Sequence, residues 1–186
     1  MFTYTIDEEL KLKLLETRDA DELFRLTDAN RAYLKEWMPW VDATQRPEDT
    51  IDYIETARKQ WVNQEGVTTC ILYRGKICGM IDLHGISRLN RKATVGYWLS
   101  ADYQGKGIMT RACRAIVDYG FHTLGLHRIE LSAGVHNKKS RAVAERLGFK
   151  QEGIARESQR LYDRFIDLVV YSMLEKEWEQ LRIIST

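Results

Sequence analysis

A glycine-rich turn, Gln104-Gly-Lys-Gly107, separates two segments of different pattern. Residues 93–100 before it are rich in β-branched and aromatic side chains, which is typical of a strand. Residues 107–124 after it carry apolar side chains at four-residue spacing, which predicts a helix. Free N–H groups and the positive dipole end at a helix start attract phosphate, and glycines let a diphosphate approach the backbone. The segment therefore predicts a phosphate site, although an ordinary tight turn would also explain the glycines alone.

The turn matches neither of two common nucleotide-binding loops. A Walker A loop requires Gly-Lys followed by Ser or Thr, whereas Lys106 is followed by Gly107. A dinucleotide fingerprint requires a third glycine where Thr110 stands. The phosphate ligand must therefore be inferred from the surrounding sequence.

The surrounding sequence resembles the GNAT superfamily of acyl-CoA-dependent N-acetyltransferases. Gln104 and Gly107 fit the family signature [Q/R]xxGx[G/A], while Met109 stands where Gly or Ala is usual. A second family pattern, NxxSxxxxxxxGF, begins at Asn137 and includes Ser140. Residues 93–149 carry both motifs in the family order. The resemblance implies a GNAT-like fold and acetyl-CoA as co-substrate, with no metal.

Two further segments, residues 33–40 and 167–174, resemble the ribosomal-protein N-terminal (Rim-type) acetyltransferases. This branch implies direct acetyl transfer to an amine, and the favoured acceptor is the N-terminal α-amine of a ribosomal protein. An amine of a polyamine, amino acid or drug is the alternative acceptor, because a fold does not fix a substrate. A non-catalytic acyl-CoA-binding module is an alternative of another class, since the strong motifs all concern the cofactor.

The resemblance also implies which residues bind the cofactor. The strand before the turn would pair with the pantetheine arm, the turn would bind the diphosphate, and Asn137 would hydrogen-bond the pantetheine. The thioester would lie between the strand ending at Leu99 and the strand ending at Val135. The expected cofactor-binding residues are Tyr97, Trp98, Leu99, Gln104, Gly105, Lys106, Gly107, Ile108, Met109, Thr110 and Asn137.

Acetyl transfer needs a neutral amine, donors for an oxyanion and a proton for the departing thiolate. Glu157 is the candidate base, directly or through water, and a solvated strand charge is its plainer interpretation. A backbone N–H near Leu99 could stabilise the oxyanion. Ser140 could protonate the thiolate or bind CoA, and helix capping is its plainer interpretation.

The remaining aromatic residues, histidines and cysteines point to no single function. Trp37 and Trp40 are candidates for an acceptor groove, and core packing or a homodimer contact would explain them equally well. The four histidines form no metal-binding spacing. Cys70 and Cys78 flank a predicted hairpin, so a cross-strand pair is an alternative to reduced, partly buried thiols.

The elements that must position these residues follow from hydrophobic periodicity and turn signals. Their order, β-α-α-β-β-β-α-β-α-β-β, predicts an α/β fold with a mixed sheet in a single domain spanning residues 1–186. The expected strands are 11–15, 68–73, 76–83, 93–100, 128–135, 150–157 and 165–174, and the expected helices are 17–37, 47–66, 107–124 and 138–147.

Composition limits the classes of partner. The 186 residues include 28 Lys and Arg against 27 Asp and Glu, a net charge of +1 that disfavours direct nucleic-acid binding. No segment has the pattern of a secretory signal or a membrane span, so a cytoplasmic location is expected. Residues 82–141 hold ten basic and four acidic residues, which leaves the remainder acidic. We therefore expect two oppositely charged openings to one cleft.

Overall fold

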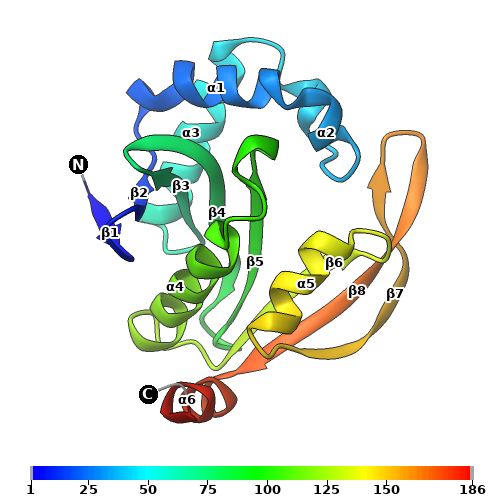
Figure 1. Ribbon diagram of the computed structural model, residues 1–186. Coiled ribbons are helices and arrows are strands. Elements are labelled where there is room, and N and C mark those ends of the chain that lie inside the picture. The colour runs from blue at the N-terminus through cyan, green and yellow to red at the C-terminus, as the bar shows by residue number, and fades with distance from the viewer. Residues whose placement is uncertain (1, 185–186) are drawn as a thin grey trace.

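The computed structural model describes residues 2–184, in which eight strands form one mixed sheet (Figure 1). The order of the strands across the sheet is β1-β2-β3-β4-β5-β6-β8-β7. Among the described strands, β5 and β6 are the parallel pair and the other neighbours are antiparallel. The strands are β1 (Thr3–Thr5), β2 (Leu10–Leu14), β3 (Val67–Tyr73), β4 (Lys76–Ser87), β5 (Lys92–Leu99), β6 (Arg128–Gly134), β7 (Lys150–Leu161) and β8 (Arg164–Leu174).

Helices cover both faces of this sheet. On one face, α1 contacts β4 and α3 contacts β3, while α4 packs on the other face against β2, β4, β5 and β6. A parallel strand pair needs a crossover connection, and α4 supplies it between β5 and β6. The helices are α1 (Ala20–Ala29), α2 (Arg31–Lys35), α3 (Pro47–Val62), α4 (Ile108–His122), α5 (Lys138–Arg146) and α6 (Glu175–Ile184).

Two hydrophobic cores result, because successive strand residues point to opposite faces. On β4, Met80 packs into the core under α1 and α3, and Ile81 packs into the core under α4. Cys70 belongs to the first core and Cys78 to the second. The two thiols therefore lie on opposite faces of the sheet and do not form the cross-strand pair that was considered. Burial raises the pKa of each thiol to about 12.

The predicted fold class is confirmed, and the differences lie at the chain ends, in the first helical segment and in three element bounds: β4 and β7 each run four residues longer than expected, and α3 ends four residues earlier. The edge strand β1 and the final helix α6 were not expected. The helix expected over 17–37 is a 3₁₀ turn followed by α1 and α2, which are separated at Asn30. The Asn30 side-chain amide donates to the Leu26 carbonyl at 2.8 Å, which satisfies an acceptor where α1 ends. No helix among residues 2–184 is long and apolar enough to cross a membrane.

Candidate active site

The parallel strands β5 and β6 separate partway along their length. Their described pairing begins at Lys92 with Arg128 and ends at Val95 with Leu131. Beyond that point, β5 continues along β4 as far as Leu99, while β6 continues along β8 as far as Gly134. An opening is left between the two strands, with Gly96 the first β5 residue beyond the last pair.

The glycine-rich turn, residues 104–107, follows the end of β5 at Leu99, on the side where β5 no longer pairs with β6. Gly105 and Gly107 have φ values of +74° and +69°, a left-handed conformation that favours glycine. A Cβ built at either residue would have no atom within 4 Å, so both face open space. Because α4 begins at Ile108, its first-turn N–H groups have no helical acceptor and face the same region.

A cavity of about 900 Å³ lies beside this turn. Of the expected cofactor-binding residues, Lys106 does not line the cavity. Its side chain is exposed, and its ammonium donates to the Asp102 carbonyl at 3.0 Å. Ser140 also lines the cavity. The other expected cofactor residues that line it are Tyr97, Trp98, Leu99, Gln104, Gly105, Gly107, Ile108, Met109, Thr110 and Asn137.

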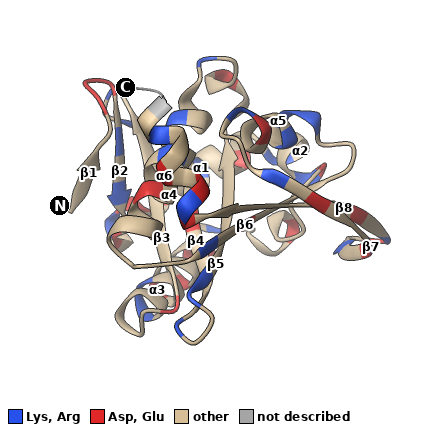
Figure 2. Cartoon of the chain, turned by 90° about the horizontal axis from the view of Figure 1, so that it is seen from below, with Lys and Arg blue, Asp and Glu red and all other residues tan. Residues whose placement is uncertain are grey.

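The charged residues that line this cavity are all basic: Arg111, Lys139 and Arg146. Arg111 donates to Asp7 at 2.7 Å, and Lys139 donates to the Gln104 side-chain oxygen at 2.7 Å. The second bond ties α5 to the glycine-rich turn. Figure 2 shows Lys and Arg along α5, the helix that carries Lys139 and Arg146. A polyanion would therefore find favourable charge here.

Tyr97, Asn137 and Ser140 line both this cavity and a second one of about 640 Å³. The Asn137 side chain accepts from the Ser140 N–H at 3.1 Å and so caps α5. The capping role considered for Ser140 thus belongs to Asn137. The Tyr97 hydroxyl donates to the Ser140 carbonyl at 3.0 Å and lies 3.1 Å from Ser140 Oγ. Burial raises the pKa of Tyr97, which keeps this phenol protonated.

Aromatic side chains dominate one wall of the second cavity. Trp37 lines both cavities, and Trp40 lines the second, where its ring lies 6.2 Å from that of Trp98. The two tryptophans singled out in the sequence are therefore brought to the same opening. Both are only partly buried, so they can offer apolar surface to an incoming group.

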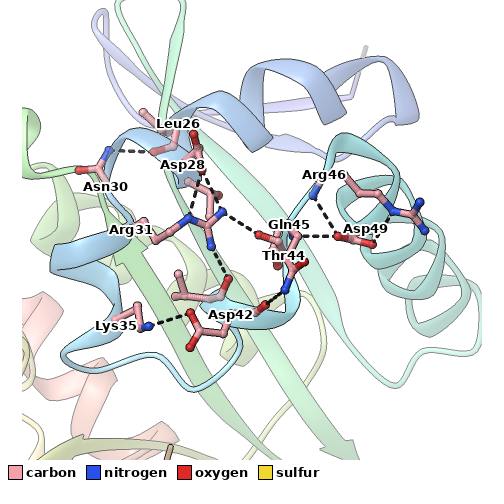
Figure 3. A network of polar contacts seen from close by, with 12 residues as sticks. Leu26, Asp28, Asn30, Arg31, Lys35, Asp42, Thr44, Gln45, Arg46 and Asp49 are labelled. Carbon is pink, nitrogen blue, oxygen red and sulfur yellow. Dashed lines mark hydrogen bonds and ion pairs between the residues drawn. The ribbon is translucent and has the colours of Figure 1, made fainter.

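Arg31 fixes the segment that carries these tryptophans (Figure 3). Its guanidinium donates to the carbonyls of Val41 and Thr44 at 2.7 and 2.8 Å, and it also bonds Asp28. Lys35 adds an ion pair with Asp42 at 2.8 Å. The loop between α2 and α3 is thus tied back to the helices that precede it.

The hairpin of β7 and β8 contributes Gln159, Ile166 and Leu168 to the lining of the second cavity. The tip of this hairpin lies beside α2 (Figure 1). The Tyr162 hydroxyl donates to the Met38 carbonyl at 2.8 Å. Glu157 lies in the irregular part of β7 with φ +48° and is exposed. It lines neither cavity, and its backbone N–H donates to Asp167 at 2.7 Å. Its role as base stays a prediction.

An Asp–His pair that was not expected from the sequence lies in the second cavity. Asp82 and His84 both line it, and His84 Nδ1 lies 2.6 Å from Asp82 Oδ1. This hydrogen bond raises the pKa of His84. The available signal was their spacing, because residues two apart on a strand share a face. Besides Tyr53 and Tyr97, the titratable residues in this lining are Asp82 and His84, so the second cavity holds a carboxylate where the first holds basic residues. This carboxylate comes from residues 82–141 and not from the acidic remainder of the sequence.

Comparisons with known proteins agree with this geometry. Residues 9–150 match the model of the acetyltransferase (GNAT) domain. The YdaF protein of Bacillus subtilis (strain 168), provisionally named a ribosomal N-acetyltransferase, is 41% identical over 96% of this chain and 98% of its own length. The ribosomal-protein-serine acetyltransferase of Escherichia coli (strain K12) is 28% identical over 92% of this chain and 96% of its length.

A solved structure shows the same fold with ligands bound. The microcin C7 self-immunity acetyltransferase MccE, in complex with acetyl-CoA and AMP, superposes with a TM-score of 0.87. It is 30% identical, and the match covers 91% of this chain and 94% of MccE. No group of three or more potential metal-binding side chains occurs among residues 2–184. The match to the family model and the 41% identity to YdaF show that the chain belongs to the GNAT family and is an N-acetyltransferase.

Proposed function

We propose that this enzyme transfers the acetyl group of acetyl-CoA to the N-terminal α-amine of a ribosomal protein. The observation that carries the proposal is the meeting of two cavities across the opening between β5 and β6. One is lined by Arg111, Lys139 and Arg146, and the other by Asp82 and aromatic side chains. A polyanionic donor and a cationic acceptor would each approach through a cavity of suitable charge.

The first cavity fits CoA in both shape and charge. The open space at Gly105 and Gly107 leaves room for a diphosphate against the main chain, where first-turn N–H groups of α4 can donate. The edge of β5 from Gly96 to Leu99 has no described β6 partner and can pair with the amides of pantetheine. Asn137 retains its amide N–H₂ for a hydrogen bond, because its oxygen already caps α5.

The second cavity fits a flexible peptide end. It lies between the loop carrying Trp37 and Trp40 and the hairpin of β7 and β8. A peptide α-amine has a pKa of about 7.7–8.0, whereas that of lysine is about 10.4, so the α-amine is far more readily neutral. Both cavities are lined by a single chain, so the proposal requires no second copy. The proposal places the enzyme in the cytoplasm, with its acceptor, as one domain spanning residues 1–186.

The residues at the junction support direct transfer. The amine lone pair attacks the thioester carbonyl carbon, a backbone N–H on the stretch of β5 from Gly96 to Leu99 stabilises the oxyanion, and the carbon–sulfur bond then breaks. Ser140 is within reach of both cavities and can donate a proton to the departing thiolate. The Tyr97 hydroxyl beside it orients Ser140.

A polyamine or another small amine is the second candidate acceptor, because Asp82 would also attract such a cation. The non-catalytic acyl-CoA-binding module considered from the sequence is set aside, because the chain is an N-acetyltransferase by its family.

Incubation of deacetylated ribosomal proteins with labelled acetyl-CoA tests the proposed acceptor. Intact-mass and N-terminal peptide analysis should place one acetyl group on the α-amine of a ribosomal protein. Label confined to lysine side chains, or to spermidine added in competition, would contradict it. The Gly107→Glu variant is the control for acetylation that does not depend on this site.

A further inference from the structure

We propose that His84, held by Asp82, is the group that accepts the proton of the acceptor amine. This inference rests on the proposed function and adds to it the identity of the base. Its basis is the position of the pair at the point where β5 and β6 separate, together with the hydrogen bond that joins the two side chains.

The strand register places the pair at that point. Asp82 lies opposite Gly96, and His84 lies opposite Thr94, which itself pairs with β6. The last β5–β6 pair is Val95 with Leu131, so the opening begins beside Asp82 and His84. A pantetheine arm paired with β5 from Leu99 toward Gly96 would bring its thioester end toward this vertex.

Gly96 provides the space that the two side chains occupy. A Cβ at this residue would lie 3.0 Å from Asp82 Oδ2 and 3.2 Å from His84 Cε1. These distances are tighter than ordinary van der Waals contact. The absence of a side chain at Gly96 thus allows the carboxylate and the imidazole to lie across β5.

The hydrogen bond selects the tautomer that a base needs. Asp82 accepts from Nδ1–H at 2.6 Å, so Nε2 of the neutral ring keeps its lone pair. The side chain of His84 is 54% exposed, whereas that of Asp82 is 21% exposed. The imidazole is therefore accessible from the second cavity, while the carboxylate that orients it is more enclosed.

The other charged groups near this end of the sheet form ion pairs with one another. On β5 and β6, Lys92 lies 3.4 Å from Glu130, and Arg128 lies 2.8 Å from the same carboxylate. On α3, Tyr53 faces the cavity, and burial raises the pKa of its phenol, so it remains neutral. Asp82 is thus the carboxylate that orients His84 and raises its pKa.

The proton and electron balance closes with this assignment. The amine nitrogen bonds to the carbonyl carbon as its proton passes to His84 Nε2, and the carbon–sulfur pair leaves with the sulfur. The thiolate takes a proton from Ser140, and the imidazolium returns one proton to solvent. Solvent restores the Ser140 hydroxyl, so the net products are the acetylated amine and CoA thiol.

The pH dependence of turnover tests this assignment. Neutral His84 is the active form, so kcat should rise with pH through a pKa that Asp82 holds above the ordinary value of about 6.5. His84→Gln should lower kcat by about 10²–10⁴-fold and remove this limb, so that the titration of the acceptor amine is the one that remains, with acetyl-CoA affinity by calorimetry unchanged. Asp82→Asn should move the limb to lower pH, because the bond that raises the pKa is lost.

His127→Gln is the matched control, because His127 is 52% exposed and also lies near a carboxylate, that of Glu175. It should retain the wild-type profile. Persistence of the acid limb in His84→Gln would overturn the assignment while leaving the proposed function standing. A fall in kcat in Glu157→Gln but not in His84→Gln would also overturn the assignment. Absence of wild-type turnover with every amine would instead overturn the proposed function, and this inference with it.

Discussion

The Tyr97 hydroxyl on β5 lies 3.1 Å from Ser140 Oγ on α5, so one hydrogen bond spans the opening where the two cavities meet. The phenol O–H donates to the Ser140 carbonyl at 3.0 Å, which leaves the phenol oxygen to accept from Ser140 Oγ. The strand that would pair with pantetheine is thereby joined to the helix that carries the candidate acid. This contact holds β5 and α5 together where the two cavities meet.

Removal of the Ser140 hydroxyl should slow the departure of the thiolate. Ser140→Ala is expected to lower kcat by about 10²-fold or more, as is usual for loss of a general acid. Tyr97→Phe should lower it by no more than about tenfold, because a net hydrogen bond contributes about 0.5–1.5 kcal/mol. Steady-state CoA release measures both, with Tyr119→Phe on α4 as the control. Wild-type kcat and acetyl-CoA affinity in Ser140→Ala would leave Ser140 a purely structural residue.

Gly107→Glu should abolish acetyl-CoA binding, because it places a carboxylate where the diphosphate is expected and strains a backbone with φ +69°. Gly125→Glu separates the two effects. Gly125 has φ +63° and open space around it, but it follows the opposite end of α4. Calorimetry should show binding lost in the first variant and retained in the second. Equal affinity in both variants would place the diphosphate elsewhere.

Trp40→Ala should weaken the acceptor more than the cofactor, because Trp40 lines only the second of the two cavities. A buried tryptophan at an interface typically contributes more than 1 kcal/mol, so the acceptor KM should rise about fivefold or more. The Kd for acetyl-CoA should not change. Trp61→Ala on α3 is the control, as Trp61 lines neither cavity. An unchanged acceptor KM would assign Trp40 to packing alone.

Arg31→Met should destabilise the protein, because the carbonyls of Val41 and Thr44 lose their donor. Loss of a partner for such groups costs about 1–3 kcal/mol, measurable by urea unfolding. The acceptor KM should rise as the loop with Trp40 loosens. Arg58→Met, at an exposed position on α3, should change stability by less than about 0.5 kcal/mol. Equal stability of the two variants would remove Arg31 from its positioning role.

Much of the fold could be predicted because its signals are local. The left-handed φ of Arg74 and Gly75 form the two-residue turn that was expected between β3 and β4. Pro47 begins α3 as expected. The division of the first helical segment at Asn30 was missed, because the Asn30 side-chain oxygen Oδ1 accepts from the N–H of Ala101, a residue distant in sequence. Tertiary contacts of this kind leave no periodic signal.

The candidate site was predictable where a motif specifies backbone geometry and less so where strands must be brought together. The glycine-rich turn follows from residue type and spacing, whereas the α5 cap was considered for Ser140 and is Asn137. The Asp82–His84 pair depends on Gly96 of the neighbouring strand and on the end of β5–β6 pairing, which only the register reveals. Glu157 was placed on a regular strand, whereas β7 is irregular between Ala155 and Gln159. An irregular strand shifts which side chains face the cleft.

Direct transfer across the opening between β5 and β6 is tested most directly by a crystal structure with a bisubstrate analogue. The analogue joins CoA sulfur, through an acetyl linker, to the α-amine of a peptide with the N-terminal sequence of the acetylated ribosomal protein. We expect CoA in the cavity with Arg111 and Lys139, the peptide in the cavity with Trp40, and the linker beside Gly96 and His84. A peptide bound outside the second cavity, or a linker remote from Gly96, would contradict this account.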